Sequence, residues 1–179
     1  MLAWIKMLRS QPLALQLRIL RWFGVIMAVM TLIPVLCWQS PPTPAANTGV
    51  TLLGKVTGGP SEWKTDRSMV SFTIKYPLPG KRLYHTSGIY TFKSNYAASG
   101  IALHSPVYVT IDEGTERPVV REVFTPQGYV LHTPAIKAHT VAVSNQHGLM
   151  MAIVLVCLSL ASFISSGVVW LRQRKPQTA

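Results

Sequence analysis

Two uninterrupted apolar runs dominate the pattern of hydrophobic and polar positions along the chain. They cover residues 22–38 and 148–171, and neither contains Asp, Glu, Lys, Arg or His. As helices they would be about 26 Å and 36 Å long, and Ile19 and Leu20 extend the first toward the roughly 30 Å of a bilayer's hydrocarbon core. The pattern therefore predicts two transmembrane helices, over residues 19–38 and 148–171, with a kink near Pro34.

Between the two apolar runs, hydrophobic and polar residues alternate with a period of two. Residues 39–48 are polar and contain three prolines, which favours an extended linker. In the clearest strand, 68–76, Val70, Phe72 and Ile74 alternate with polar residues. We expect about seven strands with frequent turn signals, hence a small antiparallel all-β domain, barrel- or sandwich-like, over residues 49–144. After the strand that begins at Gly49, the others are expected at 68–76, 83–92 (one or two short strands, broken near Gly88), 106–111, 119–124, 129–132 and 138–143, with 144–147 leading into the second span.

Charge is distributed unevenly around the two spans. The chain has 17 Lys and Arg against 6 Asp and Glu, but 49% of its residues are hydrophobic and only 13% are charged, which favours a membrane protein over a nucleic-acid-binding one. All six acids lie between the spans, whereas residues 1–18 and 172–179 carry cations only. The positive-inside rule then makes both flanks cytoplasmic and the central domain external. Expected membrane-interface anchors are Trp22, Trp38, Trp170, Arg18, Arg21 and Arg172.

The first span admits other interpretations. It could be a signal sequence cleaved near Ala45 and Ala46, or a lipoprotein anchor at Cys37, although Leu36 is large for a lipobox. Residues 1–18 could form an interfacial helix on anionic lipid, started by Ser10 and Pro12, or could merely supply orienting charge. The sequence has no N-x-[S/T] acceptor, which is consistent with a bacterial inner membrane and a periplasmic domain.

Chemistry-bearing motifs are scarce. Nucleotide-binding, zinc-protease and serine-hydrolase signatures are absent, both cysteines lie in the spans, and neither span has an internal charge, so we expect a protein that is not an enzyme and needs no cofactor. A G-x-x-L-H-[S/T]-P echo occurs twice, ending at Pro106 and Pro134. It predicts a repeated strand-and-turn, or a metal site at His104 and His132 with a third histidine. The acidic cluster of Asp112, Glu113 and Glu116 is interpreted as a solvated turn.

Small residues recur along the second span at helical spacing. Cys157, Ala161 and Ser165 form one stripe, and Ser162 and Ser166 form a neighbouring one. Small side chains let another helix approach closely, so we predict a helix-packing interface there. Its partner would be the first span, through Gly24 and Ala28, or a helix of another subunit.

One stretch carries a family resemblance. Its residues are Gly54-Lys55-Val56, the strand at 71–76, Gly80 with Tyr84, and Pro106-Val107-Tyr108-Val109. Through them, residues 50–111 resemble a family of small bacterial inner-membrane proteins in which a short β-domain lies between two transmembrane helices. That family has no assigned reaction, so the resemblance implies architecture alone, and residues 112–147 depart from its pattern.

Two hypotheses for function follow. The first is an accessory or scaffold protein whose external domain binds a partner protein and whose helices pack in a membrane complex or homo-oligomer. The second is a membrane-anchored periplasmic sensor or carrier of a ligand or metal, based on the histidines. A stoichiometric membrane partner would support the first, and metal that purifies with the protein alone would support the second.

Overall fold

The chain divides into a helical unit and a β-unit. The computed structural model describes residues 10–40, 49–78, 83–112 and 119–174. The helical unit comprises Met1–Trp38 with Asn145–Ala179, and the β-unit comprises Gln39–Ser144. Several predicted features, namely most of the linker, Glu113 and Glu116, and the tail from residue 175, lie outside the described residues.

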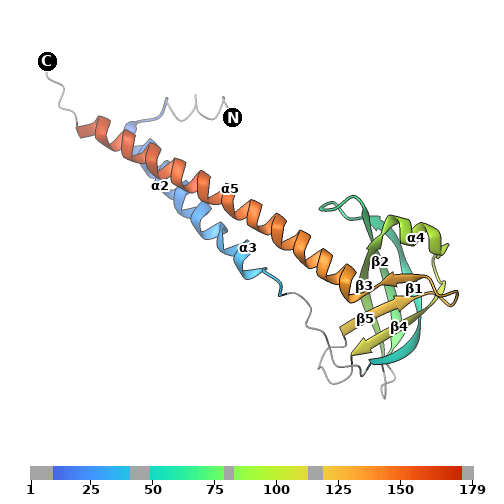
Figure 1. The fold of residues 1–179 in the computed structure, drawn as a ribbon. Helices are drawn as coiled ribbons and strands as arrows, with labels where there is room; N and C mark the ends of the chain where they lie inside the picture. The colour runs from blue at the N-terminus through green and yellow to red at the C-terminus, as the bar shows by residue number, and fades with distance from the viewer. Residues whose placement is uncertain (1–9, 41–48, 79–82, 113–118, 175–179) are drawn as a thin grey trace. The chain divides into compact units, whose positions relative to one another are not determined.

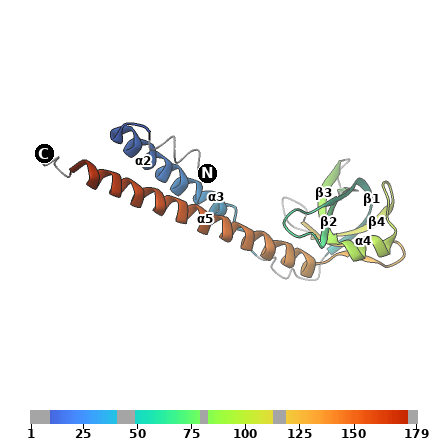
Figure 2. The ribbon, with the colours of Figure 1, turned by 90° about the horizontal axis from the view of Figure 1, so that it is seen from above.

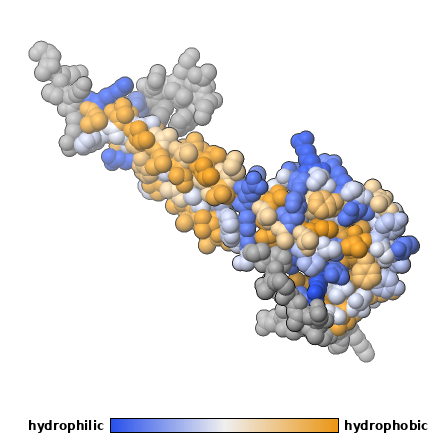
Figure 3. Space-filling view, viewed as in Figure 1, coloured by the Kyte–Doolittle hydropathy of each residue, from blue (hydrophilic) through white to orange (hydrophobic). Residues whose placement is uncertain are grey.

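Long apolar helices make up the helical unit. They are α2 (Leu13–Met30), the short α3 (Leu32–Leu36) and most of α5 (Pro134–Arg174). By length and composition, the α2–α3 segment and α5 are each apolar enough to cross a membrane. Figures 1 and 2 both show α2 and α5 side by side, and Figure 3 shows apolar side chains along their surface.

The first helix is interrupted at Thr31 and begins before the predicted start of the first span at residue 19. It breaks at Thr31, whose hydroxyl donates to the carbonyl of Met27 over 3.0 Å. The break lies one turn before Pro34, which has no N–H to donate to the preceding turn, and Thr31 itself keeps helical angles, with φ of −64° and ψ of −23°. The kink near Pro34 stays a prediction. The helix begins at Leu13, with Pro12 as N-cap and no capping side chain, so the predicted Ser10 cap is wrong. Residues 13–18 are therefore the first turns of α2, whereas residues 1–9 of the expected interfacial helix lie outside the described residues.

The β-unit is a six-stranded antiparallel sheet that curls into a half-barrel (Figure 1). Its strand order is β3-β2-β1-β4-β5-β6. The predicted antiparallel β-domain between two apolar helices is therefore confirmed, with six strands among the described residues where about seven were expected. The strands are β1 (Gly49–Glu62), β2 (Met69–Pro77), β3 (Tyr84–Phe92), β4 (Pro106–Asp112), β5 (Val119–Phe124) and β6 (Val130–His132).

Alternating side chains build the interior of the half-barrel. In β2, Phe72, Ile74 and Tyr76 are buried while their neighbours are half-exposed, as the period of two predicts. The core continues across the sheet in Val56, Ile89, Val107, Val109, Ile111, Val120, Val123 and Leu131. At Gly54 a Cβ would lie 3.0 Å from the carbonyl oxygen of Lys75 and 3.1 Å from Val109. Glycine therefore lets β1 pass closely between its neighbours.

The predicted strand at 138–143 is wrong, because these residues belong to α5. The Thr133 hydroxyl accepts a hydrogen bond from the N–H of Ile136 over 3.2 Å, so Thr133 caps the helix and Pro134 occupies its first position. Ile136 and Val141 of this helix are buried. The β-branched residues near Val141 suggested a strand, but propensity is a weak guide against a capped helix that continues to Arg174.

The repeated motif does not form a repeated structure. In the first copy, Gly100 ends the helix α4 (Lys93–Ser99), which was not predicted, and Pro106 begins β4. In the second copy, β6 precedes Pro134, and Pro134 begins α5. The copies share only a glycine in the left-handed region, with φ of 62° at Gly100 and 87° at Gly128. The predicted break at Gly88 is also wrong, because β3 is continuous.

Candidate functional site

The two long helices meet along a seam of small residues. The hydroxyl of Ser159 donates to the carbonyl of Gly24 over 2.9 Å, and the hydroxyl of Ser162 donates to the carbonyl of Leu20 over 2.6 Å. Residue numbers rise along one helix as they fall along the other, so the helices are antiparallel. Both serines and Gly24 are buried. Serine-to-carbonyl bonds of this kind require the backbones to approach closely, which only small residues permit.

Buried positions along the seam alternate in steps of three and four. On α5 the seam positions are Ala152, Leu155, Ser159, Ser162, Ser166 and Val169, and on the first helix they are Leu17, Leu20, Gly24, Met27, Thr31 and Pro34, all buried or half-buried. This is the spacing of helices that pack at a shallow crossing angle. At Gly24 an added Cβ would lie 3.1 Å from the ring of Phe163, so a larger residue there would push against α5.

The predicted packing stripes on α5 have different surroundings. Ser162 and Ser166 are buried in the seam, whereas Cys157, Ala161 and Ser165 are exposed. On the first helix, Gly24 is in the seam and Ala28 is exposed. The sequence prediction missed Ser159 because it followed a strict spacing of four, whereas the three-and-four alternation of small residues would have identified it. The stripe of Cys157, Ala161 and Ser165 lies outside the seam, and its role as a packing interface stays a prediction.

All six predicted membrane-interface anchors are exposed. Trp22, Trp38, Arg18, Arg21, Trp170 and Arg172 lie on the surface of the helical unit. Trp22, at 64% exposure, and Arg21 are adjacent on α2. Indole rings and guanidinium groups placed together in this way are typical of helix ends at a membrane–water interface.

An apolar row crosses the outer face of the β-unit. Leu53 of β1 pairs with Tyr108 of β4, Tyr108 pairs with Phe124 of β5, and Phe124 pairs with Val130 of β6. The exposed fractions are 59% for Leu53, 37% for Tyr108 and 50% for Val130. The rings of Tyr108 and Phe124 have centroids 5.4 Å apart. These four residues, the outer row, form a continuous apolar strip over four neighbouring strands, in which Leu53, Tyr108 and Val130 are exposed and Phe124 is half-buried.

Cations and hydroxyls border the outer row. Lys55 and Lys75 are directly opposite each other on β1 and β2, and the Lys75 ammonium lies 4.9 Å from the centre of the Tyr84 ring. On the other side of the row, the hydroxyls of Thr51 and Thr110 are 3.1 Å apart. An apolar centre with a polar border is the usual composition of a protein-binding surface.

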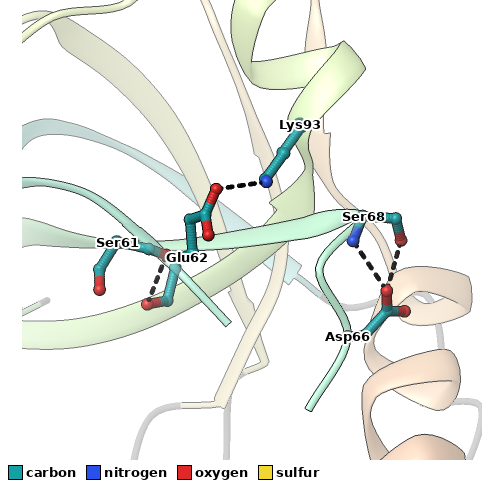
Figure 4. A network of polar contacts seen from close by, with 6 residues as sticks. Ser61, Glu62, Asp66, Ser68 and Lys93 are labelled. Carbon is teal, nitrogen blue, oxygen red and sulfur yellow. Dashed lines mark hydrogen bonds and ion pairs between the residues drawn. The ribbon is translucent and has the colours of Figure 1, made fainter. Parts of the chain in front are cut away.

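A polar network joins the loop after β1 to the first turns of α5. Asp66 accepts hydrogen bonds from the hydroxyl and the N–H of Ser68, and His139 Nε2 donates to its other oxygen over 3.0 Å (Figure 4 shows the serine contacts). The Ser68 and His139 hydrogen bonds lower the pKa of Asp66 to about 2. In a catalytic triad the histidine lies between serine and carboxylate, whereas here the carboxylate lies between the other two. The network therefore positions a loop.

The ion pair drawn in Figure 4 joins the far end of β1 to α4. Lys93 Nζ lies 2.6 Å from Glu62 Oε1. Hydrogen bonding and attraction to Lys93 lower the pKa of Glu62. Both side chains are well exposed, so this pair contributes little to stability.

His132 closes the half-barrel between its two edge strands. Its Nδ1 lies 2.9 Å from the carbonyl oxygen of Tyr90 on β3, so the ring donates to that carbonyl. The side chain is buried at 5% exposure, and burial lowers its pKa. A shallow cleft of about 340 Å³ opens beside it, lined by β3, β5 and the first turns of α5. The carbonyl contact explains why this histidine is buried.

The predicted histidine metal site is not assembled. His104 is exposed and has a left-handed φ of 68°, while His132 is buried against Tyr90. Within the described ranges, no three His, Cys, Asp or Glu side chains gather closely enough to hold a metal ion. Comparison with protein families, with curated proteins and with solved structures finds no match to the chain.

Proposed function

We propose that the chain is a non-enzymatic accessory or scaffold protein of a bacterial inner membrane. Its two apolar helices anchor it, both flanks lie in the cytoplasm, and the β-unit is presented in the periplasm to bind a partner protein. The outer row of Leu53, Tyr108, Phe124 and Val130 is the observation that carries this proposal.

The composition of the outer row favours a protein partner. Single exposed apolar residues are ordinary on protein surfaces, but contiguous ones mark interaction sites. Aromatic residues are enriched at the centres of protein interfaces. Tyr108 and Phe124 already pack against each other, so they lose little side-chain freedom when a partner covers them. The strands hold the whole row in a rigid arrangement.

The helical unit supports a role in a complex. The seam serines Ser159 and Ser162 already bind the first helix, so the pair does not need a further partner to satisfy them. The stripe of Cys157, Ala161 and Ser165 lies outside the seam and is exposed. Against lipid, small residues bring no packing advantage, whereas against another helix they permit close approach.

A photo-crosslinking experiment tests the proposed function. A photoreactive phenylalanine analogue is placed at Tyr108 in the full chain, expressed in bacterial membranes. A matched control carries the analogue at Thr86, an exposed position of β3 outside the outer row. We expect one defined protein adduct from position 108 and none from position 86.

A second arm measures association directly. The double variant Tyr108→Thr and Phe124→Thr keeps residues that suit strands but removes the aromatic surface. We expect the adduct's protein to co-purify with the parent chain from mild detergent and to be lost from this variant, while Thr86→Ala retains it. Equal recovery with the double variant would show that the outer row does not bind the partner.

A further inference from the structure

A groove runs along one side of the α2–α5 pair. It has a volume of about 500 Å³ and is lined by Arg21, Val25, Phe163, Ser166, Gly167 and Trp170. Arg21 and Val25 are four residues apart on α2, so they lie on one face of that helix. Phe163, Gly167 and Trp170 follow each other at helical spacing on α5. Apolar side chains from both helices therefore line the groove, Val25 from α2 and Phe163 from α5.

Gly167 keeps the groove open. A Cβ built at Gly167 would meet no heavy atom within 4 Å. At Gly24, in contrast, an added Cβ would lie 3.1 Å from the Phe163 ring. The glycine in the seam is required for close helix packing, whereas the glycine in the groove leaves space unfilled. A slender apolar ligand fits such a space.

The polar end of the groove is cationic. Arg21 lines it, and Arg18, one turn away on α2, lines a second hollow together with Arg21 and Trp22. No Asp or Glu occurs in residues 1–48 or 145–179, so no carboxylate side chain of the helical unit can neutralise these guanidinium groups. Guanidinium binds phosphate through paired, charge-assisted hydrogen bonds. Trp170 adds the aromatic ring expected at headgroup level.

We propose that this groove binds one anionic phospholipid. An acyl chain lies along Val25, Phe163 and Gly167, and Arg21 donates hydrogen bonds to the headgroup phosphate. A partner helix would suit the apolar walls but would leave Arg21 without an anion. A lipid with net negative charge satisfies both the apolar lining of the groove and the Arg21 guanidinium, so it is preferred over a zwitterionic lipid. The proposal rests on the membrane anchoring described above.

Native mass spectrometry of the full chain in mild detergent tests this site. The probes are phosphatidylglycerol and phosphatidylcholine with identical acyl chains. Phosphatidylcholine carries a choline cation that offsets its phosphate, whereas phosphatidylglycerol keeps its net negative charge, so we expect at least about tenfold greater retention of phosphatidylglycerol. Gly167→Leu, which fills the groove, and Arg21→Gln, which removes its cation, should each abolish that preference.

Matched controls separate the groove from general attraction to lipid. Arg172→Gln removes an exposed arginine outside the groove, and Val168→Leu enlarges the exposed neighbour of Gly167. Both should retain the parent preference. Far-UV circular dichroism verifies that each variant keeps its helices.

Three results would overturn the proposal. They are equal retention of the two lipids by the parent chain, an unchanged preference in Gly167→Leu, and a loss in Arg172→Gln as large as that in Arg21→Gln. Recovery of the chain in the membrane fraction is measured first. A chain absent from that fraction would contradict the anchoring itself, whereas a membrane-bound chain without lipid preference would contradict only the groove.

Discussion

A disulfide between Pro34 and Gly148 would test the antiparallel helix pair directly. A Cβ at Gly148 lies 3.8 Å from the Cβ of Pro34, within the range of about 3.5–4.5 Å that disulfides require. We therefore expect Pro34→Cys with Gly148→Cys to oxidise readily. Both native cysteines, Cys37 and Cys157, are exposed and are replaced by serine in the parent of this variant.

The expected stabilisation follows from the length of the loop. The bridge closes a loop of about 114 residues, and in the chain-entropy model a loop of about 100 residues contributes about 4.7 kcal/mol. Engineered bridges often deliver less, so we expect about 2–4 kcal/mol between the oxidised and reduced forms of one variant. That comparison cancels the separate effects of removing proline and glycine, because both substitutions are present in both forms.

Fragment linkage provides the assay. A protease site inserted between residues 112 and 119 cuts the chain, and the two fragments stay together on a non-reducing gel only if the bridge has formed. Leu36→Cys with Gly148→Cys is the matched control, because Leu36 is 82% exposed and lies on another face of α3. Oxidation of the control as fast as that of the test pair, or a test pair that remains reduced, would refute the antiparallel pairing at this position.

Three further predictions concern packing, pH and topology. Ala161→Leu or Ser165→Leu should weaken assembly in the membrane, while Leu160→Ala should change it little; unchanged detergent-resistant association in all three variants would exclude the exposed stripe as an interface. Burial lowers the pKa of His132 below 6.5 in the folded state, so the unfolded chain binds its proton first as pH falls. The β-unit should therefore lose stability below about pH 6.5, and His132→Gln should flatten this dependence in thermal unfolding; parallel curves would contradict it. Reporter fusions at both termini should read cytoplasmic and an insertion between residues 112 and 116 should read external, whereas a C-terminus accessible to external protease would disprove this topology.

The hydrophobic pattern predicted helices and strands accurately where it kept one period over several residues. The strand expected at 68–76 is β2, because one of its faces lines the interior and imposes strict alternation. The pattern failed at 138–143, where β-branched residues coincide with a helix. The capping pair of Thr133 and Pro134 is the local signal that would have corrected it.

The sequence by itself determined that two long apolar helices enclose a β-rich segment, because the composition and period of each segment are local properties. Only the tertiary structure decided which residues meet. Leu53 and Tyr108 are far apart in sequence, and strand register alone brings them together in the outer row. Likewise, Ser159 and Ser162 pack in the seam while Ser165 is exposed, because the crossing of two helices selects one face of α5. Local patterns cannot specify such pairings, because each depends on a second segment distant in the chain.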